Sequence, residues 1–195
     1  MANFKNMVPF LIKWETGIVK KQGESNESLF ARAKESKSGF VDDPDDRGGA
    51  TVLGVTLGTF KNYMVKKGKP NMTVNDLKKL SYEDWLSILK SMYWDRWKAD
   101  SINDQSVAEI LVDWVWGSGK WGIVVPQRIL GVKEDGIVGP KTLEAVNSFD
   151  PPSFFQAVKS ERIEFYHDIV KKTPSQQKFL NGWINRTNDH VYIKY

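Results

Sequence analysis

Hydrophobic residues return every three or four positions in the first segment of the chain. This spacing predicts a short amphipathic helix, and it is carried by Met7, Phe10, Leu11 and Trp14. Glu15 follows Trp14 near the expected C-terminal end of the helix, and Gly17 is the residue type that commonly ends one. The pattern therefore predicts a carboxyl group beside the aromatic face of a helix.

The same periodicity predicts helices along most of the remaining chain. They are expected from residue 57 to Gly68, over residues 82–97 after a capping Ser81, over 106–116 and 125–130, from Ser153 onward, and from Pro174. Strand-like runs are few. Only "TVLGV" and the tail "HVYIKY" have the composition of strands, which predicts a mainly α fold with a small β or loop element.

Residues 18–38 interrupt this pattern with a polar and basic segment. Leu29, Phe30 and Ala33 are its main apolar positions, and they could form one turn of helix after Ser25 or Asn26. We expect this segment to be an excursion over the surface.

The stretch "GFVDDPDDRGGATVLGVT", residues 39–56, concentrates four aspartates within five positions. Composition alone favours a hydrated turn, because Asp43 before Pro44 suits a type I turn and the glycine pair supplies backbone freedom. The order of the residues favours a site instead. A glutamate at a helix end, followed by an acidic loop, offers two carboxyl environments of different kinds, as acid–base catalysis requires.

Glycoside hydrolysis needs one carboxyl that donates a proton to the leaving oxygen and a second group that stabilises the transition state or positions water. Aromatic surroundings favour the uncharged form of a carboxyl, so Glu15 suits the first role. A carboxylate is also badly placed near a helix C-terminus, where the helix dipole disfavours it. This misplacement favours a functional reason for Glu15 over an ordinary surface position.

Composition limits the alternatives. The 195 residues fit one domain, or one domain with a subsidiary lobe, and the net charge of +4 comes from scattered lysines and arginines. Scattered cations fit an anionic cell wall better than nucleic acid. With no cysteine, neither a disulfide nor a thiolate metal site is possible. We find no signal peptide or membrane span and expect synthesis in the cytoplasm, with action at the periplasm or cell wall after release or non-classical export.

The acidic stretch resembles the second part of the N-terminal signature of glycoside hydrolase family 108. This family comprises bacterial and phage N-acetylmuramidases and is a distant member of the lysozyme-like group. The C-terminal half resembles the associated peptidoglycan-binding region through "DWVWGSG", "PQRILGVKEDGIVGPKT" and "FLNGWINR". The resemblance covers almost the whole chain. It implies a lysozyme-like helical fold with its small β or loop element around the acidic turn.

The resemblance also implies roles for individual residues. Glu15 would be the general acid, and Asp45 or Asp46 together with Thr51 would place or activate water. The substrate would be peptidoglycan, cut at the β-1,4 bond between N-acetylmuramic acid and N-acetylglucosamine, without a cofactor or metal. One departure is that the family's glutamate directly precedes Gly-Gly-aromatic, whereas about twenty residues separate Glu15 from Gly39 here. The insertion 18–38 must therefore loop out.

We expect residues 1–100 to form the glycosidase region and residues 101–195 the helical peptidoglycan-binding region, packed as one compact unit. The sequence leaves the oligomeric state open, with a monomer favoured. Trp14, Trp116 and Trp121 are candidates to stack on sugar rings, while most tryptophans at helical spacing should belong to the core. Asp113 interrupts an apolar helix face and should be a hydrogen-bonded buried group. His167 and His190 lack metal-ligand spacing and should be ordinary surface or helix residues.

Three other functions compete with the muramidase. The first is a non-catalytic wall-binding or secretion-assisting protein with a lysozyme-like fold, which the insertion favours. The second is a related glycosidase, such as a chitinase or lytic transglycosylase. Nucleic-acid binding is the weakest, because the sequence has no basic stripe.

Overall fold

The computed structural model describes residues 1–42 and 49–194. The chain divides into two compact units. The N-terminal unit comprises Lys5–Ser91, and the C-terminal unit comprises Met1–Phe4 with the chain from Met92 onward. Helices predominate in both, and a small antiparallel sheet lies in the N-terminal unit. The prediction of a mainly α fold with a small β element is confirmed.

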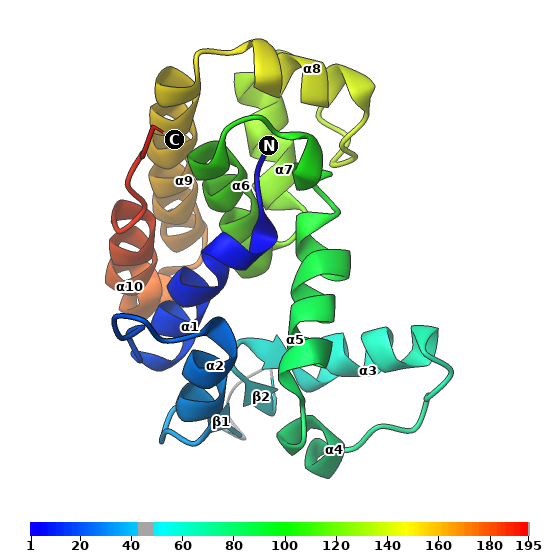
Figure 1. Ribbon diagram of the computed structural model, residues 1–195. Helices are drawn as coiled ribbons and strands as arrows, with labels where there is room; N and C mark the ends of the chain where they lie inside the picture. Colours follow the sequence, from blue (N-terminus) through cyan, green and yellow to red (C-terminus); the bar gives the residue numbers. More distant parts are fainter. Residues whose placement is uncertain (43–48, 195) are drawn as a thin grey trace. The chain divides into compact units, whose positions relative to one another are not determined.

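The N-terminal unit consists of short helices and strands. In order they are the short 3-10 turn η1 (Phe4–Met7), α1 (Val8–Thr16), α2 (Asn26–Lys34), β1 (Phe40–Val41), β2 (Thr51–Val52), β3 (Val55–Thr56), α3 (Leu57–Lys66), α4 (Val74–Lys78) and α5 (Tyr82–Leu89). Figure 1 shows these elements from blue to green. The expected capping role of Ser81 is confirmed, since its hydroxyl accepts a hydrogen bond from the Asp84 amide.

The three strands form an antiparallel sheet in the order β1-β2-β3. A two-residue turn joins β2 to β3, with φ of 44° at Leu53 and 78° at Gly54. Positive φ at both central residues suits a hairpin, although leucine adopts it at a cost. A tertiary contact holds the turn, because the buried indole of Trp85 donates a 3.0 Å hydrogen bond to the Leu53 carbonyl. The strand predicted from "TVLGV" is therefore a hairpin.

Helix α2 contradicts the expectation of a surface excursion over residues 18–38. Its first turn is capped by Ser25, whose hydroxyl accepts a 3.1 Å hydrogen bond from the Ser28 amide. The Phe30 ring lies 5.4 Å from that of Tyr82 and 5.8 Å from that of Trp85, between ring centroids. At about 100° per residue, the three apolar positions of α2 fall within one arc of about 100°, so they share one side of the helix. All three are buried: Leu29, Phe30 and Ala33.

Two local contacts fix the ends of this insertion. Before α2, the Arg32 guanidinium donates to both carboxylate oxygens of Glu24, at 3.0 and 2.8 Å. These hydrogen bonds are the main cause that lowers the pKa of Glu24 to about 2. After α2, Gly39 lies so close to the helix end that a Cβ there would stand 2.3 Å from the Lys34 carbonyl oxygen. The insertion is thus a folded helix with a defined entry and exit.

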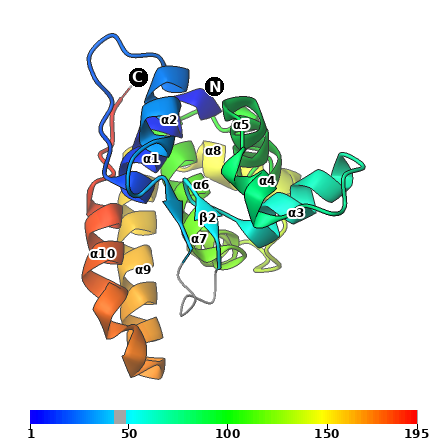
Figure 2. The same cartoon turned by 90° about the horizontal axis from the view of Figure 1, so that it is seen from below.

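The C-terminal unit contains the longer helices. Its elements are the π-helical η2 (Lys90–Trp94), which begins in the preceding unit, η3 (Ala99–Ser101), α6 (Gln105–Ser118), α7 (Trp121–Ile129), α8 (Pro140–Ser148), α9 (Pro151–Lys172), η4 (Pro174–Gln176) and α10 (Gln177–Asn188). Helix α6 packs on α7 and α9, and α9 packs on α10. Figures 1 and 2 both show α9 and α10 side by side.

The expected strand in the tail is wrong, because residues 190–194 have no regular structure. Side chains hold this tail instead. The Tyr192 hydroxyl donates a 2.9 Å hydrogen bond to Asp104, and the Ser106 hydroxyl both donates to the Ile193 carbonyl and accepts from its amide. Four of the eight tryptophans are fully buried core residues, fewer than expected: Trp85, Trp94, Trp97 and Trp114.

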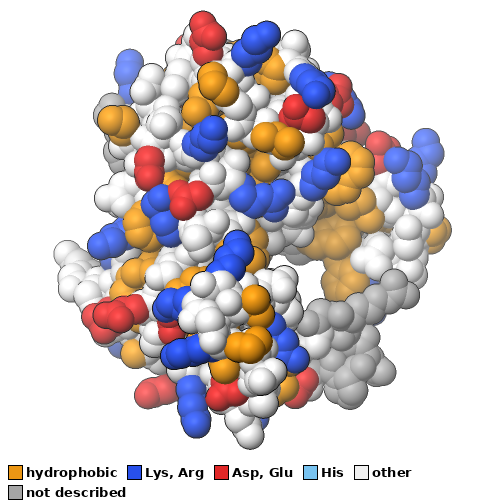
Figure 3. Space-filling model, turned by 90° about the vertical axis from the view of Figure 1, so that its right-hand side faces the viewer, with side chains coloured by type: hydrophobic (Ala, Val, Ile, Leu, Met, Phe, Trp, Pro, Cys, Tyr) orange, Lys and Arg blue, Asp and Glu red, His pale blue; other side chains and the backbone are white. Residues whose placement is uncertain are grey.

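None of the described helices is long and apolar enough to cross a membrane. Figure 3 shows one face of the molecule, on which lysines and arginines alternate with acidic and apolar side chains. On this face the cations form no continuous stripe.

Candidate functional site

The first candidate site residue, Glu15, stands in the last turn of α1. Gly17 ends this helix in the left-handed conformation, with φ of 74°, and its amide donates a 2.7 Å hydrogen bond to the Lys13 carbonyl. The buried Thr16 hydroxyl donates to the Ile12 carbonyl and accepts from the Ile18 amide. These bonds fix the backbone on both sides of Glu15. The predicted position of Glu15 at a helix end before Gly17 is confirmed.

The side chain of Glu15 is half-buried on the aliphatic face of α1. At 100° per residue, position 15 falls between positions 8 and 11, and Val8 and Leu11 are fully buried. Phe10 and Trp14 lie at the edge of this face, both half-buried, with ring centroids 6.4 Å apart. The expected aromatic face is therefore an aliphatic face with an aromatic edge.

Of the residues predicted to act with Glu15, the structure describes Thr51. Thr51 lies in β2, half-buried, where it pairs with Val41 of β1 and Thr56 of β3. Its hydroxyl donates a 3.1 Å hydrogen bond to the Gly49 carbonyl. Asp45 and Asp46 lie outside the described residues. Thr51 and Glu15 belong to the same compact unit.

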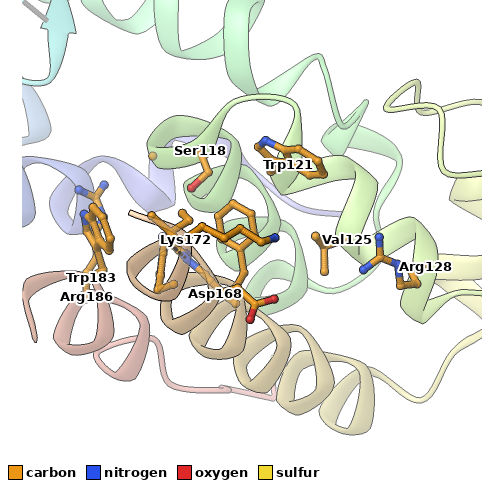
Figure 4. Close-up of a pocket in the computed structure, with 13 residues that line it drawn as sticks. Ser118, Trp121, Val125, Arg128, Asp168, Lys172, Trp183 and Arg186 are labelled. Carbon is orange, nitrogen blue, oxygen red and sulfur yellow. Dashed lines mark hydrogen bonds between the residues drawn. The ribbon is translucent and has the colours of Figure 1, made fainter. Parts of the chain in front are cut away.

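A pocket of about 630 Å³ lies within the C-terminal unit. Helices α6, α7, α9 and α10 contribute its walls. In Figure 4, Trp183 and Arg186 lie at one end and Arg128 at the other, with Trp121 and Lys172 between them. A pocket of this size accommodates a small-molecule ligand or a short segment of a polymer.

Aromatic rings line much of this pocket. Trp121, at the first position of α7, is 51% exposed, and its ring centroid lies 6.0 Å from that of Phe165. Trp183 is half-buried and is supported by Tyr166, at 5.1 Å between ring centroids. Trp116, the other predicted sugar-stacking residue of this unit, is instead half-buried against Tyr93 at 4.5 Å and is not among the residues that line the pocket.

A cluster of charges around one buried carboxylate forms part of the pocket wall. The Asp113 carboxylate is fully buried and lies 2.8 Å from Arg162 Nη1 and 2.7 Å from Arg186 Nη2. His190 Nε2 lies 3.1 Å from the same carboxylate. An ionised carboxylate only accepts hydrogen bonds, so the neutral His190 ring carries its proton on Nε2. The prediction of Asp113 as a buried hydrogen-bonded group is confirmed.

The electrostatics of this cluster follow from its partners. Burial raises the pKa of Asp113, but the charges of Arg186 and Arg162 and the hydrogen bond from His190 outweigh it, so the net pKa lies well below the ordinary value. Burial lowers the pKa of His190, and the neighbouring carboxylate only partly opposes this. The prediction of His190 as an ordinary surface or helix residue is wrong.

Sequence reasoning missed the cationic part of the pocket. Arg162 is buried among the apolar positions of α9, and Arg186 follows Trp183 by one helical turn. A charged residue within an apolar helix face is a signal for a buried ion pair. The sequence prediction applied this signal to Asp113 but not to Arg162. No group of three or more residues suited to hold a metal ion occurs among the described residues.

Comparison with solved structures identifies the fold of the chain. One solved structure, that of SagA from Brucella abortus, matches with a TM-score of 0.71 and 24% sequence identity, over 95% of this chain and 89% of that one. This likeness shows the fold. No curated protein sequence matches the chain. The fold predicted as lysozyme-like is confirmed.

Two family models match in sequence. Residues 30–119 match glycosyl hydrolase 108, and residues 121–188 match the domain described as a predicted peptidoglycan domain. Both matches agree with the family resemblance that the motifs predicted, and the match to the peptidoglycan domain follows the match to the hydrolase. These matches support a peptidoglycan hydrolase. The hydrolase match begins at residue 30, inside α2 and after Glu15, whereas the peptidoglycan match includes most of the pocket wall.

Proposed function

We propose that this protein is an N-acetylmuramidase that cleaves the β-1,4 bond between N-acetylmuramic acid and N-acetylglucosamine, with Glu15 as general acid. One observation carries the proposal. In a chain whose residues 30–119 match glycosyl hydrolase 108, Glu15 is a half-buried carboxyl in the last turn of a helix whose end is fixed by Gly17. A catalytic acid must be held in one position, since proton transfer depends on hydrogen-bond reach.

In this mechanism the Glu15 carboxyl donates its proton to the glycosidic oxygen as the bond to the sugar breaks. The transition state then resembles an oxocarbenium ion, and a second group stabilises it or directs water to it. Asp45 or Asp46 and Thr51 are proposed for that role. Thr51 contributes from a strand that is paired on both sides, which gives its hydroxyl a rigid support.

The decisive experiment compares Glu15→Gln with Glu35→Gln in the clearing of purified cell walls. Glu35 is the matched control because it is exposed, lies at the end of α2, and precedes Gly39 by only four residues. We expect Glu15→Gln to lower the rate by about 10²- to 10⁴-fold and Glu35→Gln to leave it unchanged. Thermal unfolding of both variants verifies that the fold is retained. Full clearing by a folded Glu15→Gln variant excludes Glu15 as the acid.

Analysis of the reducing ends of the products by mass spectrometry tests which bond is cut. N-acetylmuramic acid at the new reducing end supports the muramidase. N-acetylglucosamine at that position would indicate cleavage of the alternate bond, and 1,6-anhydro ends would indicate a lytic transglycosylase.

A second candidate function is a wall-binding or secretion-assisting protein without turnover. Two observations favour it: the hydrolase match begins after Glu15, and the folded helix α2 stands between Glu15 and Gly39. Sedimentation with insoluble walls, without release of reducing ends, would support this function over the enzyme.

A further inference from the structure

We infer that the pocket of the C-terminal unit binds a carboxylate-bearing muropeptide, that is, an N-acetylated amino-sugar ring joined to an acidic peptide. This inference rests on the proposed function for its substrate, and it assigns to named residues a binding role that the family matches give only to a whole region. The pocket lies within one compact unit, between α6, α7, α9 and α10.

The aromatic wall suits a sugar ring. Trp121 lines the pocket and is 51% exposed. Trp183 is held from behind by Tyr166 and by Phe179, whose ring stacks at 29° and 5.8 Å between centroids. Apolar ring faces that are rigidly supported bind with a small loss of side-chain entropy, and indoles contribute strongly to recognition.

The charges of the wall suit an anion. Arg128, Arg162, Lys172 and Arg186 line the pocket, with Asp168 as the single acidic lining residue among those described. Asp113 pairs with Arg162 and Arg186, and Glu134 pairs with Arg128 at 2.8 Å. Four cations against these three carboxylates leave one positive charge in excess.

Lys172 is the cation that remains for a ligand. Within the described part of the chain it forms no ion pair, although it is exposed on α9 and lines the pocket. Figure 4 shows its side chain extending across the pocket between the two ends. A flexible ammonium group that reaches over an aromatic wall can meet a carboxylate while the sugar ring stacks below it.

Two arginines of this wall, Arg162 and Arg186, are fixed by hydrogen bonds before a ligand arrives. Arg162 is 1% exposed, and its Nε donates a 2.9 Å hydrogen bond to the Tyr166 hydroxyl. Arg186 Nε and Nη2 both donate to Asp113, at 3.1 and 2.7 Å. Because these guanidinium groups are already fixed, binding does not have to order them. The charge also distinguishes a muropeptide from a neutral chitin fragment.

Titration calorimetry on the whole chain tests the inference with two probes: a disaccharide-tetrapeptide muropeptide and neutral chitobiose. This muropeptide is a product of muramidase cleavage, so the wild-type enzyme does not consume it during the measurement. We expect the muropeptide to bind at least about tenfold more tightly than chitobiose and to weaken as salt rises, because a charge pair contributes.

Two pocket variants and one control locate the site. Trp121→Ala should weaken muropeptide binding by about tenfold, because it removes the exposed indole. Lys172→Gln should weaken it by about three- to tenfold and abolish most of the salt dependence. Lys171→Gln, which removes the neighbouring exposed charge outside the pocket, should leave affinity unchanged.

Each outcome separates this inference from the proposed enzyme. Absence of muropeptide binding at millimolar concentration, equal binding of chitobiose, or unchanged affinity in both pocket variants overturns the inference, while wall clearing by the wild type would still support the muramidase. Conversely, intact muropeptide binding that both pocket variants weaken, in a chain that clears no walls, would support the pocket and overturn the enzyme.

Discussion

Helices α2 and α9 each carry an arginine paired with a carboxylate, but the surroundings of the two pairs differ. Arg32 pairs with Glu24 at the surface of the N-terminal unit, and 32% of its side chain is exposed. Arg162 pairs with Asp113 inside the C-terminal unit, where the side chains are 1% and 0% exposed. The first pair shapes a loop. The second pair joins α6 to α9, and the same Asp113 carboxylate also contacts α10 and the tail after it.

This difference shows two ways to stabilise small helical units. The insertion of the N-terminal unit is held mainly by apolar and aromatic contacts, such as Phe30 on Trp85, with ion pairs at its edge. The C-terminal unit instead groups four titratable or charged side chains around one site, of which Asp113, Arg162 and His190 are buried. A buried charge is costly unless every partner is present, so such a cluster makes the unit sensitive to the loss of any member.

The largest effect is expected from Asp113→Ala. It leaves two arginines without their shared carboxylate, which should lower the free energy of unfolding by about 3–5 kcal/mol. Asp84→Ala in the N-terminal unit is the matched control, because Asp84 pairs with Lys67 at 2.6 Å but both side chains are partly exposed. Its cost should be about 1 kcal/mol or less. Urea unfolding of both variants measures the difference, and equal costs would contradict the comparison.

Phe30→Ala tests whether apolar packing holds α2. Phe30 is 4% exposed between Tyr82 and Trp85, so its truncation should cost about 3 kcal/mol. Val19→Ala, in the same insertion but 61% exposed, should change stability by less than about 0.5 kcal/mol. Urea unfolding again provides the values. An unchanged free energy of unfolding for Phe30→Ala would contradict the packing of α2 and favour the surface segment that the sequence predicted.

The pH dependence of stability tests the buried histidine. The folded-state pKa of His190 lies below its ordinary value of 6.5. As pH falls through 6.5 the unfolded chain therefore binds this proton first, and stability decreases, by at most about 1.4 kcal/mol per pH unit for one group. His190→Gln should show a shallower decrease between pH 6.5 and 5. Identical slopes in wild type and variant would exclude His190 as the cause.

The smallest effect is expected from Ser25→Ala, which removes the hydroxyl that caps α2. The cost should be about 1 kcal/mol, measured by thermal unfolding. Ser38→Ala, at an exposed position after the helix, is the control and should have no measurable effect. If Ser25→Ala does not change the stability, the packing of the buried face alone stabilises α2.

The sequence predicted the helices well because their apolar positions repeat over several turns. It predicted the end of α1 because Gly17 marks it. It did not predict the burial of α2, since three apolar residues within a polar segment carry too weak a pattern. The tail strand was wrong because the backbone of Ile193 pairs with the Ser106 hydroxyl of α6 instead of a neighbouring strand.

The candidate site, too, could be predicted from the sequence only in part. Asp113 could be recognised as a buried polar residue from its place within an apolar face. Its partners could not, because Arg186 and His190 lie 73 and 77 residues away along the chain and only the folded structure brings them together. Lys172 carried no sequence signal, since a lysine at the end of a helix is ordinary. The catalytic role of Glu15 remains a prediction.

The burial of Phe30 has a consequence for anyone who wishes to shorten this protein. Removing residues 18–38 would reunite Glu15 with Gly39 in sequence, but it would also take away the ring that covers the indole of Trp85. That indole supports the hairpin through the Leu53 carbonyl. A trimmed chain would therefore need a new large side chain, supplied by α1 or α5, to close the opening.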